Sequence, residues 1–145
     1  MSLYVELLRH VSLLFKKTLI VVDLVIKRVD GSIVLVKRAY EPFKGYWALP
    51  GGLLKFNESV EDTAIREAKE ETGLDIKLEN LIGVFSDPKR DPRGHVISIS
   101  FIASEVVGEL RAGSDATEVG SFDIIPDKLA FDHREILRKA GFVKE

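Results

Sequence analysis

The fold is decided by residues 52–74, which read GLLKFNESVEDTAIREAKEETGL. The centre of this stretch predicts a helix. Asn57 or Ser59 can act as its N-cap, acidic residues follow in the first turn, and Gly73 can act as its C-cap. At about 100° per residue, the last three glutamates of the helix fall within an arc of roughly 100° on one face.

These three glutamates, Glu67, Glu70 and Glu71, predict a metal site. Their arc overlaps the side that bears Val60 and Ala64, so we expect the carboxylates to lean toward the protein body. Clustered anions repel one another and take up protons unless a cation neutralises them. Carboxylate oxygens are hard ligands suited to Mg²⁺ or Mn²⁺. The alternative is a charged helix with solvated i,i+4 pairs.

Two neighbouring features fit the metal-site interpretation. The planar guanidinium of Arg66 can hold Glu58 or Glu70 through a bidentate bond and so fix the direction of a carboxylate. Gly51 and Gly52 leave the backbone uncovered, so that a carbonyl oxygen can approach the metal.

Outside this stretch, β-branched runs at 18–27 and 32–38 flank Asp30-Gly31. An Asp-Gly pair supplies the positive φ angles of a type I′ turn, which predicts a hairpin. The other expected elements are a loop over 41–52 with a short strand near 46–49, strands at 75–85 and 95–107, and a last helix that Asp132 and Glu135 cap and that ends near Gly141. Strands before and after a central helix predict an α/β/α sandwich with a mixed β-sheet.

The strand at 95–107 alternates Ile97, Ile99 and Phe101 with Ser98 and Ser100, so one of its faces is expected to be more polar than the other.

The composition is that of an ordinary globular protein. The 145 residues have room for one domain, over 1–145, and 46 % hydrophobic with 30 % charged residues excludes general disorder. No cysteine is present, which excludes disulfides and thiolate metal sites and favours a cytoplasmic location. No apolar run reaches the roughly 20 residues that a membrane span needs.

Residues 1–17 are expected to form an N-terminal helical extension, because apolar side chains recur there at helical spacing: Leu7, Leu8, Val11, Leu14 and Phe15. Two interpretations stay open. The helix covers the core, or its apolar stripe forms the contact of a homodimer.

The whole stretch 52–74 resembles the Nudix box, G-x₅-E-x₇-R-E-U-x-E-E-x-G-U with U aliphatic, at Gly52, Glu58, Arg66, Glu67, Glu70, Glu71, Gly73 and Leu74. One departure is Ala68, which stands where the family usually has a larger aliphatic residue. The resemblance implies a Nudix-type α/β/α fold. It also implies a divalent metal, Mg²⁺ or Mn²⁺, that Glu67, Glu70 and Glu71 bind, with Glu58 and the Gly52 carbonyl in support.

Flanking segments resemble the ADP-ribose pyrophosphatase branch of this family, namely RAYEPFKGYWALPGG, DPKRDPRGH, AGSDATEVGSF and LAFDH. This resemblance implies hydrolysis of the pyrophosphate bond of ADP-ribose to AMP and ribose 5-phosphate. It implies a small-molecule nucleotide as partner, and neither nucleic acid nor membrane. The alternatives are hydrolysis of nucleoside triphosphates or dinucleoside polyphosphates, and a non-catalytic domain that senses ADP-ribose.

Five residues outside the box are candidates for substrate binding. The resemblance implies that Arg38, at the end of a strand, contacts the substrate phosphate, and the alternative is a solvated strand end. Trp47 either stacks on the base or lies in the core. Arg90, Arg93 and His95 either meet a second phosphate or the terminal ribose, or belong to a solvated loop.

Glu118 is the candidate general base, because it lies in a segment expected to be a loop where Nudix enzymes often place an extra acid near the metals. A surface role is the alternative. Asp132 is interpreted as a helix cap and His133 as a packed side chain.

Overall fold

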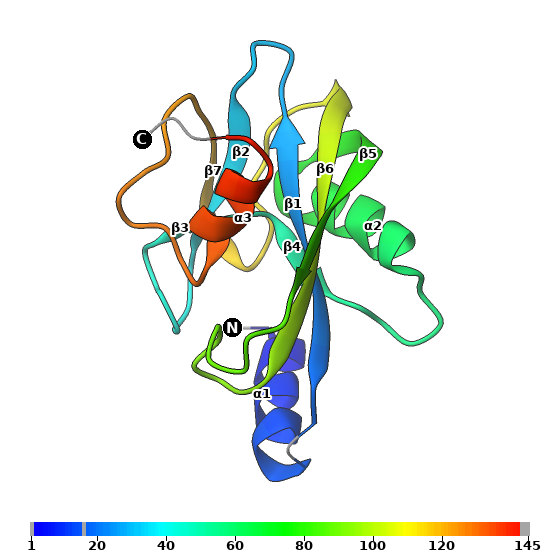
Figure 1. Cartoon of the computed structure of the whole chain (residues 1–145), viewed down its shortest axis with the longest axis vertical. Coiled ribbons are helices and arrows are strands. Elements are labelled where there is room, and N and C mark those ends of the chain that lie inside the picture. The colour runs from blue at the N-terminus through cyan, green and yellow to red at the C-terminus, as the bar shows by residue number, and fades with distance from the viewer. Residues whose placement is uncertain (1, 16, 143–145) are drawn as a thin grey trace.

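The computed structural model describes residues 2–15 and 17–142. Its elements, in chain order, are α1 (Leu3–Phe15), β1 (Leu19–Lys27), β2 (Ile33–Arg38), β3 (Trp47–Ala48), β4 (Gly51–Leu53), α2 (Val60–Thr72), β5 (Leu74–Phe85), β6 (Val96–Gly108), β7 (Ala116–Phe122) and α3 (His133–Lys139). Figure 1 shows their arrangement. No helix of the described part is long and apolar enough to cross a membrane.

The strands form one sheet in the order β3-β2-β1-β6-β5, with β4 paired to β1 and β7 paired to β2. The pairing of β1 with β6 is parallel and runs from Leu19↔Val96 to Lys27↔Ser104, whereas the other pairs are antiparallel. The predicted mixed sheet is confirmed.

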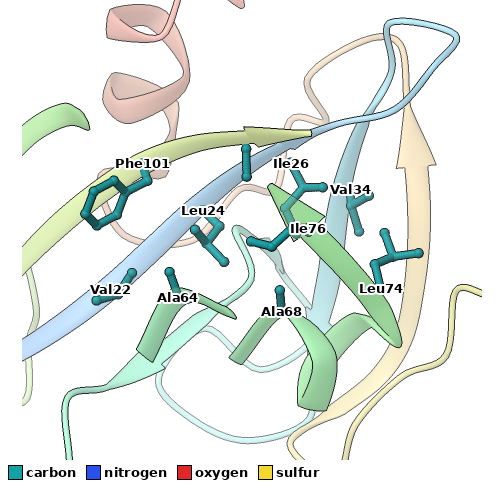
Figure 2. Packing of buried hydrophobic residues seen from close by; sticks show 10 residues of the cluster. Val22, Leu24, Ile26, Val34, Ala64, Ala68, Leu74, Ile76 and Phe101 are labelled. Atoms are coloured by element: carbon teal, nitrogen blue, oxygen red, sulfur yellow. The ribbon is translucent and has the colours of Figure 1, made fainter. Parts of the chain in front are cut away.

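Helices cover both faces of this sheet. On one face, Leu24 and Val34 pack against Ala64 and Ala68 of α2 (Figure 2). On the other face, Val25 and residues of β2 pack against α3. Because successive side chains of β1 point to opposite faces and both faces are covered, this strand is apolar almost throughout. The predicted α/β/α sandwich is confirmed.

The hairpin at Asp30-Gly31 is confirmed, but its predicted turn type is wrong. A type I′ turn needs a positive φ at both residues, and only Gly31, at 86°, has one. The reason lies in the side chain of Asp30. Its Oδ1 accepts hydrogen bonds from the backbone N–H and the hydroxyl of Ser32, at 2.9 and 2.6 Å, and Gly31 N–H is bound to Arg28 O instead.

Beyond this turn, β1 and β2 separate, since their register contains the single pair Lys27↔Ile33. The chain from 47 to 53 fills the split. It pairs with β2 through β3 and then with β1 through β4, where Val22 lies opposite Gly52. The sequence predicted a short strand near 46–49 but placed Gly51 and Gly52 in a loop, whereas both belong to β4.

The caps of α2 follow the prediction. Ser59 is the N-cap and accepts a hydrogen bond from Asp62 N–H at 3.0 Å, and Gly73 ends the helix with a φ of 79°. At α3 the prediction fails. Asp132 occupies the N-cap position but makes no side-chain capping bond, because its carboxylate binds Arg90 instead.

The more polar face of β6 is buried, not solvated. Ser98 and Ser100 are fully inaccessible, and Ser98 Oγ donates a hydrogen bond of 2.5 Å to Asp23 Oδ2. At the amino terminus, the predicted helix is present as α1. Its Leu3 and Leu7 are exposed, and the side chains of residues 11–15 lie outside the part described.

Candidate active site

Arg66 of α2 holds the carboxylates of the site. Its Nε and Nη2 form a fork on Glu58, at 2.6 and 2.9 Å, and Nη1 donates to Glu67 at 2.7 Å and to Glu70 at 3.2 Å. The remaining donor reaches the backbone oxygen of Leu53 at 3.1 Å. The sequence offered Glu58 or Glu70 as partners of this arginine, and both are bound.

Glu58 is fixed in its ionised form. The bonds from Arg66, with further ones from the Thr63 hydroxyl and the Lys55 N–H, lower the pKa of Glu58 to about 2. The same contacts raise the pKa of Arg66. This pair therefore keeps its charges across the physiological range and acts as a rigid support for the neighbouring glutamates.

Glu67 and Glu71 lie against the glycines of β4. A Cβ on Gly52 would overlap the carboxyl group of Glu67, so any larger residue there would displace that carboxylate. Glu71 Oε2 accepts a hydrogen bond from Gly51 N–H at 3.3 Å. Burial raises the pKa of Glu67, and burial with the charge of Glu67 raises the pKa of Glu71 strongly.

Glu70 departs from the expected inward orientation. Its side chain is 55 % exposed, although one oxygen reaches Arg66. It still lines one cavity together with Arg66, Glu67, Glu71, Asp115 and Tyr4, which we call the acidic cavity.

A hard divalent cation fits the chemistry of the acidic cavity. Its walls carry four carboxylates and no sulfur or imidazole ligand, and two of the carboxylates have pKa values raised by burial and by mutual repulsion. In the described residues, no three acidic or histidine side chains are already arranged around one point. Arg66 accounts for this, because it holds one oxygen each of Glu67 and Glu70.

Asp115 is a residue of the site that sequence reasoning missed. Its Oδ1 is buried and has no hydrogen-bond partner within the described residues. Its charge contributes to the raised pKa of Glu71. The residue precedes β7 in a segment that folds back on α2, since Gly113 N–H binds Glu71 O at 3.3 Å. The segment GSDATE contains two acids, Asp115 and Glu118, and its pattern led us to expect Glu118 in the site.

A second cavity, the arginine cavity, adjoins the first and shares Glu71 and Asp115 with it. Arg38 and Arg93 both line it, and their guanidinium carbons lie 5.0 and 5.5 Å from the ring centre of Phe131. Burial and the nearby charge of Arg93 lower the pKa of Arg38. Asp91 orients Arg93, because it accepts hydrogen bonds from Nε and Nη2 at 3.0 and 2.7 Å. Arg38 and the remaining donors of Arg93 make this side of the cavity suited to an anion.

The other substrate-binding candidates have different surroundings. Arg90 also lines the arginine cavity, but its side chain is only 3 % exposed and is bound to Asp132, so the solvated alternative is wrong. His95 joins the two ends of its loop: its ring contacts Ser86 O at 3.1 Å, away from both cavities. Trp47 packs on the α3 side of the core and edge-on to Phe122, as its core interpretation predicted.

Glu118 lies on strand β7, not in the expected loop. Its side chain is 59 % exposed, its closest cation is Lys37 at 4.0 Å, and it lines neither cavity. His133 is buried in the packed position that the sequence interpretation gave it.

Comparison with known proteins agrees with this fold. The NUDIX domain family profile matches residues 17–140. The chain is 53 % identical over 121 residues to an ADP-ribose pyrophosphatase of Methanocaldococcus jannaschii, an alignment that covers 82 % of this chain and 70 % of the relative. The chain belongs to the Nudix family.

Two solved structures extend the comparison. The NUDIX domain of Shewanella oneidensis NrtR, complexed with ADP ribose, superimposes with a TM-score of 0.75 at 27 % identity over 97 % of each chain. A bifunctional NMN adenylyltransferase/ADP ribose pyrophosphatase from Francisella tularensis, complexed with AMP and Mn ion, gives a TM-score of 0.78 at 26 % identity. That match covers 93 % of this chain and 45 % of the Francisella protein.

Proposed function

We propose that this protein hydrolyses the pyrophosphate bond of a nucleoside diphosphate joined to another group, with ADP-ribose as the preferred substrate and Mg²⁺ or Mn²⁺ as the cofactor. One observation carries the proposal. The acidic cavity meets the arginine cavity, which Arg38, Arg90 and Arg93 line together with several acids, at Glu71 and Asp115. A diphosphate held by Arg38 and Arg93 would therefore present its phosphorus atoms to the carboxylate side.

The similar proteins support the substrate. The Methanocaldococcus relative is named an ADP-ribose pyrophosphatase, and the Shewanella domain is complexed with ADP ribose. The Mn ion of the Francisella complex supports a divalent cation. In this chain Glu67, Glu70 and Glu71 would hold the cation, with the Gly52 carbonyl beside them and Glu58 in support through Arg66.

When bound, divalent ions lower the pKa of water and neutralise phosphate charge, which favours attack on phosphorus. Arg66 keeps the acidic side chains oriented, and Arg38 with Arg93 binds the diphosphate. Water forms a new bond to one phosphorus, the bridging P–O bond breaks, and a carboxylate accepts the proton of the water. The products from ADP-ribose are AMP and ribose 5-phosphate.

We assign the proton acceptor to Asp115. It lines both cavities, and its buried Oδ1 has no other partner in the described part of the chain. Glu118, the residue that the sequence favoured, faces solvent next to Lys37. A base must come within hydrogen-bond reach of the water, or within reach through one further water, and the position of Asp115 meets this requirement better.

The function is tested with a panel of ADP-ribose, diadenosine polyphosphates and nucleoside triphosphates, each with Mg²⁺, followed by identification of the products. The expected result is the highest kcat/KM for ADP-ribose and no turnover after chelation of the metal. A tenfold preference for another class would overturn the substrate. Tight binding of ADP-ribose without any turnover would favour a sensing role.

We also propose the extent of the domain, a homodimer contact and a cellular location for this protein. Residues 1–145 form a single Nudix domain with α1 as an N-terminal extension, because the family match begins at residue 17.

The exposed Leu3 and Leu7 of α1 form a homodimer contact, which light scattering would detect. The location is cytoplasmic, because a chain without cysteine fits a reducing compartment.

A further inference from the structure

A buried polar network lies on the face of the sheet that α3 covers, and three of its members line the inner wall of the arginine cavity. We call it the Asp23 network. Its members are Asp23 of β1, Ser98 and Ser100 of β6, Arg90 of the preceding loop, and Asp132 and His133 at the start of α3. The side chains of Asp23, Arg90 and His133 are 9 %, 3 % and 5 % exposed. Charged groups are rarely buried to this extent unless they are paired, so their placement here needs a reason.

The ring of His133 has a defined orientation. Its Nδ1 lies 3.0 Å from the backbone N of Leu49, and a peptide N–H is always a donor, so this ring nitrogen must be an acceptor. In the neutral ring the proton is then on Nε2, which faces Asp23 Oδ1 at 3.7 Å. Burial lowers the pKa of His133, which keeps the ring neutral. Nδ1 is therefore engaged by the backbone of Leu49, whereas Nε2 faces the carboxylate of Asp23 beyond hydrogen-bond distance.

Leu49 is the point where the chain passes from β3 toward β4. One residue later, Pro50 O accepts a hydrogen bond from Leu24 N–H at 2.8 Å. Gly51 then lies so close to β1 that a Cβ would overlap Val22 O and approach Asp23 Oδ1 at 2.8 Å. The network thus contacts this short segment twice, through the ring of His133 at Leu49 and through the carboxylate of Asp23 at Gly51.

The far side of the same segment touches the carboxylates of α2. Gly51 N–H donates to Glu71 at 3.3 Å, and Gly52 lies directly against Glu67. Residues 49–52 are therefore held between the buried network on one face of the sheet and the acidic cavity on the other. A shift of this segment would change the position of the Gly52 carbonyl relative to both glutamates.

We propose that Asp23 and His133 are positioning residues of the hydrolase: through the Leu49 N–H they set the position of the Gly51–Gly52 backbone against Glu71 and Glu67. This inference rests on the proposed function for its effect on turnover. Groups that orient the ligands of a metal typically affect metal affinity or activity by about 10- to 100-fold.

The test compares two amide variants of His133. An asparagine amide takes the place of Nδ1 and can accept the Leu49 N–H, whereas a glutamine amide extends toward the position of Nε2. His133→Asn should keep kcat and Mn²⁺ affinity within about threefold of wild type, and His133→Gln and His133→Leu should lose about tenfold or more in both. The KM for nucleotide should change less than kcat, because Arg38 and Arg93 are untouched.

Two measurements do not depend on turnover. Mn²⁺ binding is followed by electron paramagnetic resonance without substrate, and amide exchange is followed in the 47–53 segment. Faster exchange with weaker Mn²⁺ binding in His133→Leu, but not in His133→Asn, would support the positioning role even if the wild type turned over no nucleotide in the panel. In that case the proposed function would be wrong, and the positioning role would still be supported.

The matched control is Leu137→Ala, which leaves a cavity in α3 but keeps the bond from Leu49 N–H to His133 Nδ1. It should lower Tm and leave kcat and Mn²⁺ affinity unchanged at temperatures well below Tm. Equal losses in Leu137→Ala and His133→Leu would overturn the proposal, because stability of α3 would then be the cause. Equal kcat values and equal Mn²⁺ affinities in His133→Asn and His133→Gln would overturn the proposal as well. This comparison can be made even if His133→Leu does not fold.

Discussion

Two arginines organise carboxylates in this protein, and they do so in opposite settings. The side chain of Arg66 is 20 % exposed and binds glutamates of its own helix and the loop before it. Arg90 is 3 % exposed and forms its fork with Asp132, 42 residues away in the sequence. Arg66 stands at the wall of the acidic cavity, where a cation can compete for its partners, whereas the guanidinium of Arg90 is itself buried between Asp132 and the buried Asp23.

The difference in setting separates two roles. Ion pairs near solvent contribute little to stability, because water and salt screen them. Breaking a buried pair leaves a charge without water or partner and costs much more. We therefore expect substitutions around Arg66 to act mainly on turnover and substitutions around Arg90 to act mainly on folding.

The largest effect should follow from Arg90→Met. The variant leaves the buried carboxylate of Asp23 and the partly exposed carboxylate of Asp132 without their cation, which should lower the free energy of unfolding by about 3–5 kcal/mol. Urea denaturation measures this value. Lys89→Met, at an exposed position in the same loop, should change it by less than about 0.5 kcal/mol. A loss in Arg90→Met no larger than in the control would remove the distinction between the two arginines.

The opposite behaviour is expected for Glu71→Gln. A carboxamide cannot supply an anionic ligand, so kcat should fall at least about 10²-fold at saturating Mg²⁺. Stability should change little or rise, because one of the repelling charges next to Glu67 is gone. Steady-state kinetics and urea denaturation test both statements, with Glu61→Gln at an exposed position of the same helix as the control. A kcat within a few-fold of wild type would contradict the metal-site assignment.

Asp115→Asn and Glu118→Gln decide between the two candidate bases. General base catalysis contributes about 10²-fold or more, so Asp115→Asn should lower kcat by at least that amount. Glu118→Gln should stay within about twofold, because this side chain is exposed on β7 and lines neither cavity. The kcat of both variants is measured between pH 6 and 9. The reverse ranking would restore Glu118 as the base.

The smallest expected effect concerns pH. Burial lowers the pKa of His133 in the folded protein below its ordinary value of 6.5, and Arg90 and Arg38 add to this while Asp23 and Asp132 oppose it. The unfolded chain then binds more protons at acid pH. The stabilisation is fully present above pH 6.5 and is lost as the pH falls through the lower folded pKa.

His133→Asn should therefore flatten the dependence of unfolding free energy on pH below 6.5. The difference from wild type should be at most about 1.4 kcal/mol per pH unit, the limit for one proton. Urea denaturation at a series of pH values measures the slope. An unchanged slope would show that His133 does not titrate between the folded and unfolded states.

The contrast between the two arginines also explains what the sequence could predict. Glu67, Glu70 and Glu71 recur at helical spacing, so local geometry places them on one face before any tertiary contact is known. The partners of Arg90 come together only through tertiary contacts. Asp132 looked like a helix cap because its local spacing fits one, and a nonlocal charge proved the stronger partner.

The missed site residue has the same explanation. Asp115 and Glu118 are three residues apart, and both are acids in one segment. The tertiary structure distinguishes them. The chain before β7 folds back onto the end of α2, which brings Asp115 to the cavities. The pairing of β2 with β7 leaves Glu118 beside Lys37. Composition and spacing contain no information about that fold-back, whereas the layer order followed from the pattern of strands and helices.

The split between β1 and β2 has an evolutionary consequence. Because the two strands pair only at their tip, the bridging chain from 47 to 53 separates the helix that carries the acids from the loop at 86–95 that carries Arg93. Mutations in that loop can reshape what the arginine cavity accepts without moving α2. Under the proposed function, changes in that loop are expected to alter which nucleotide is accepted while the acids of α2 keep their places.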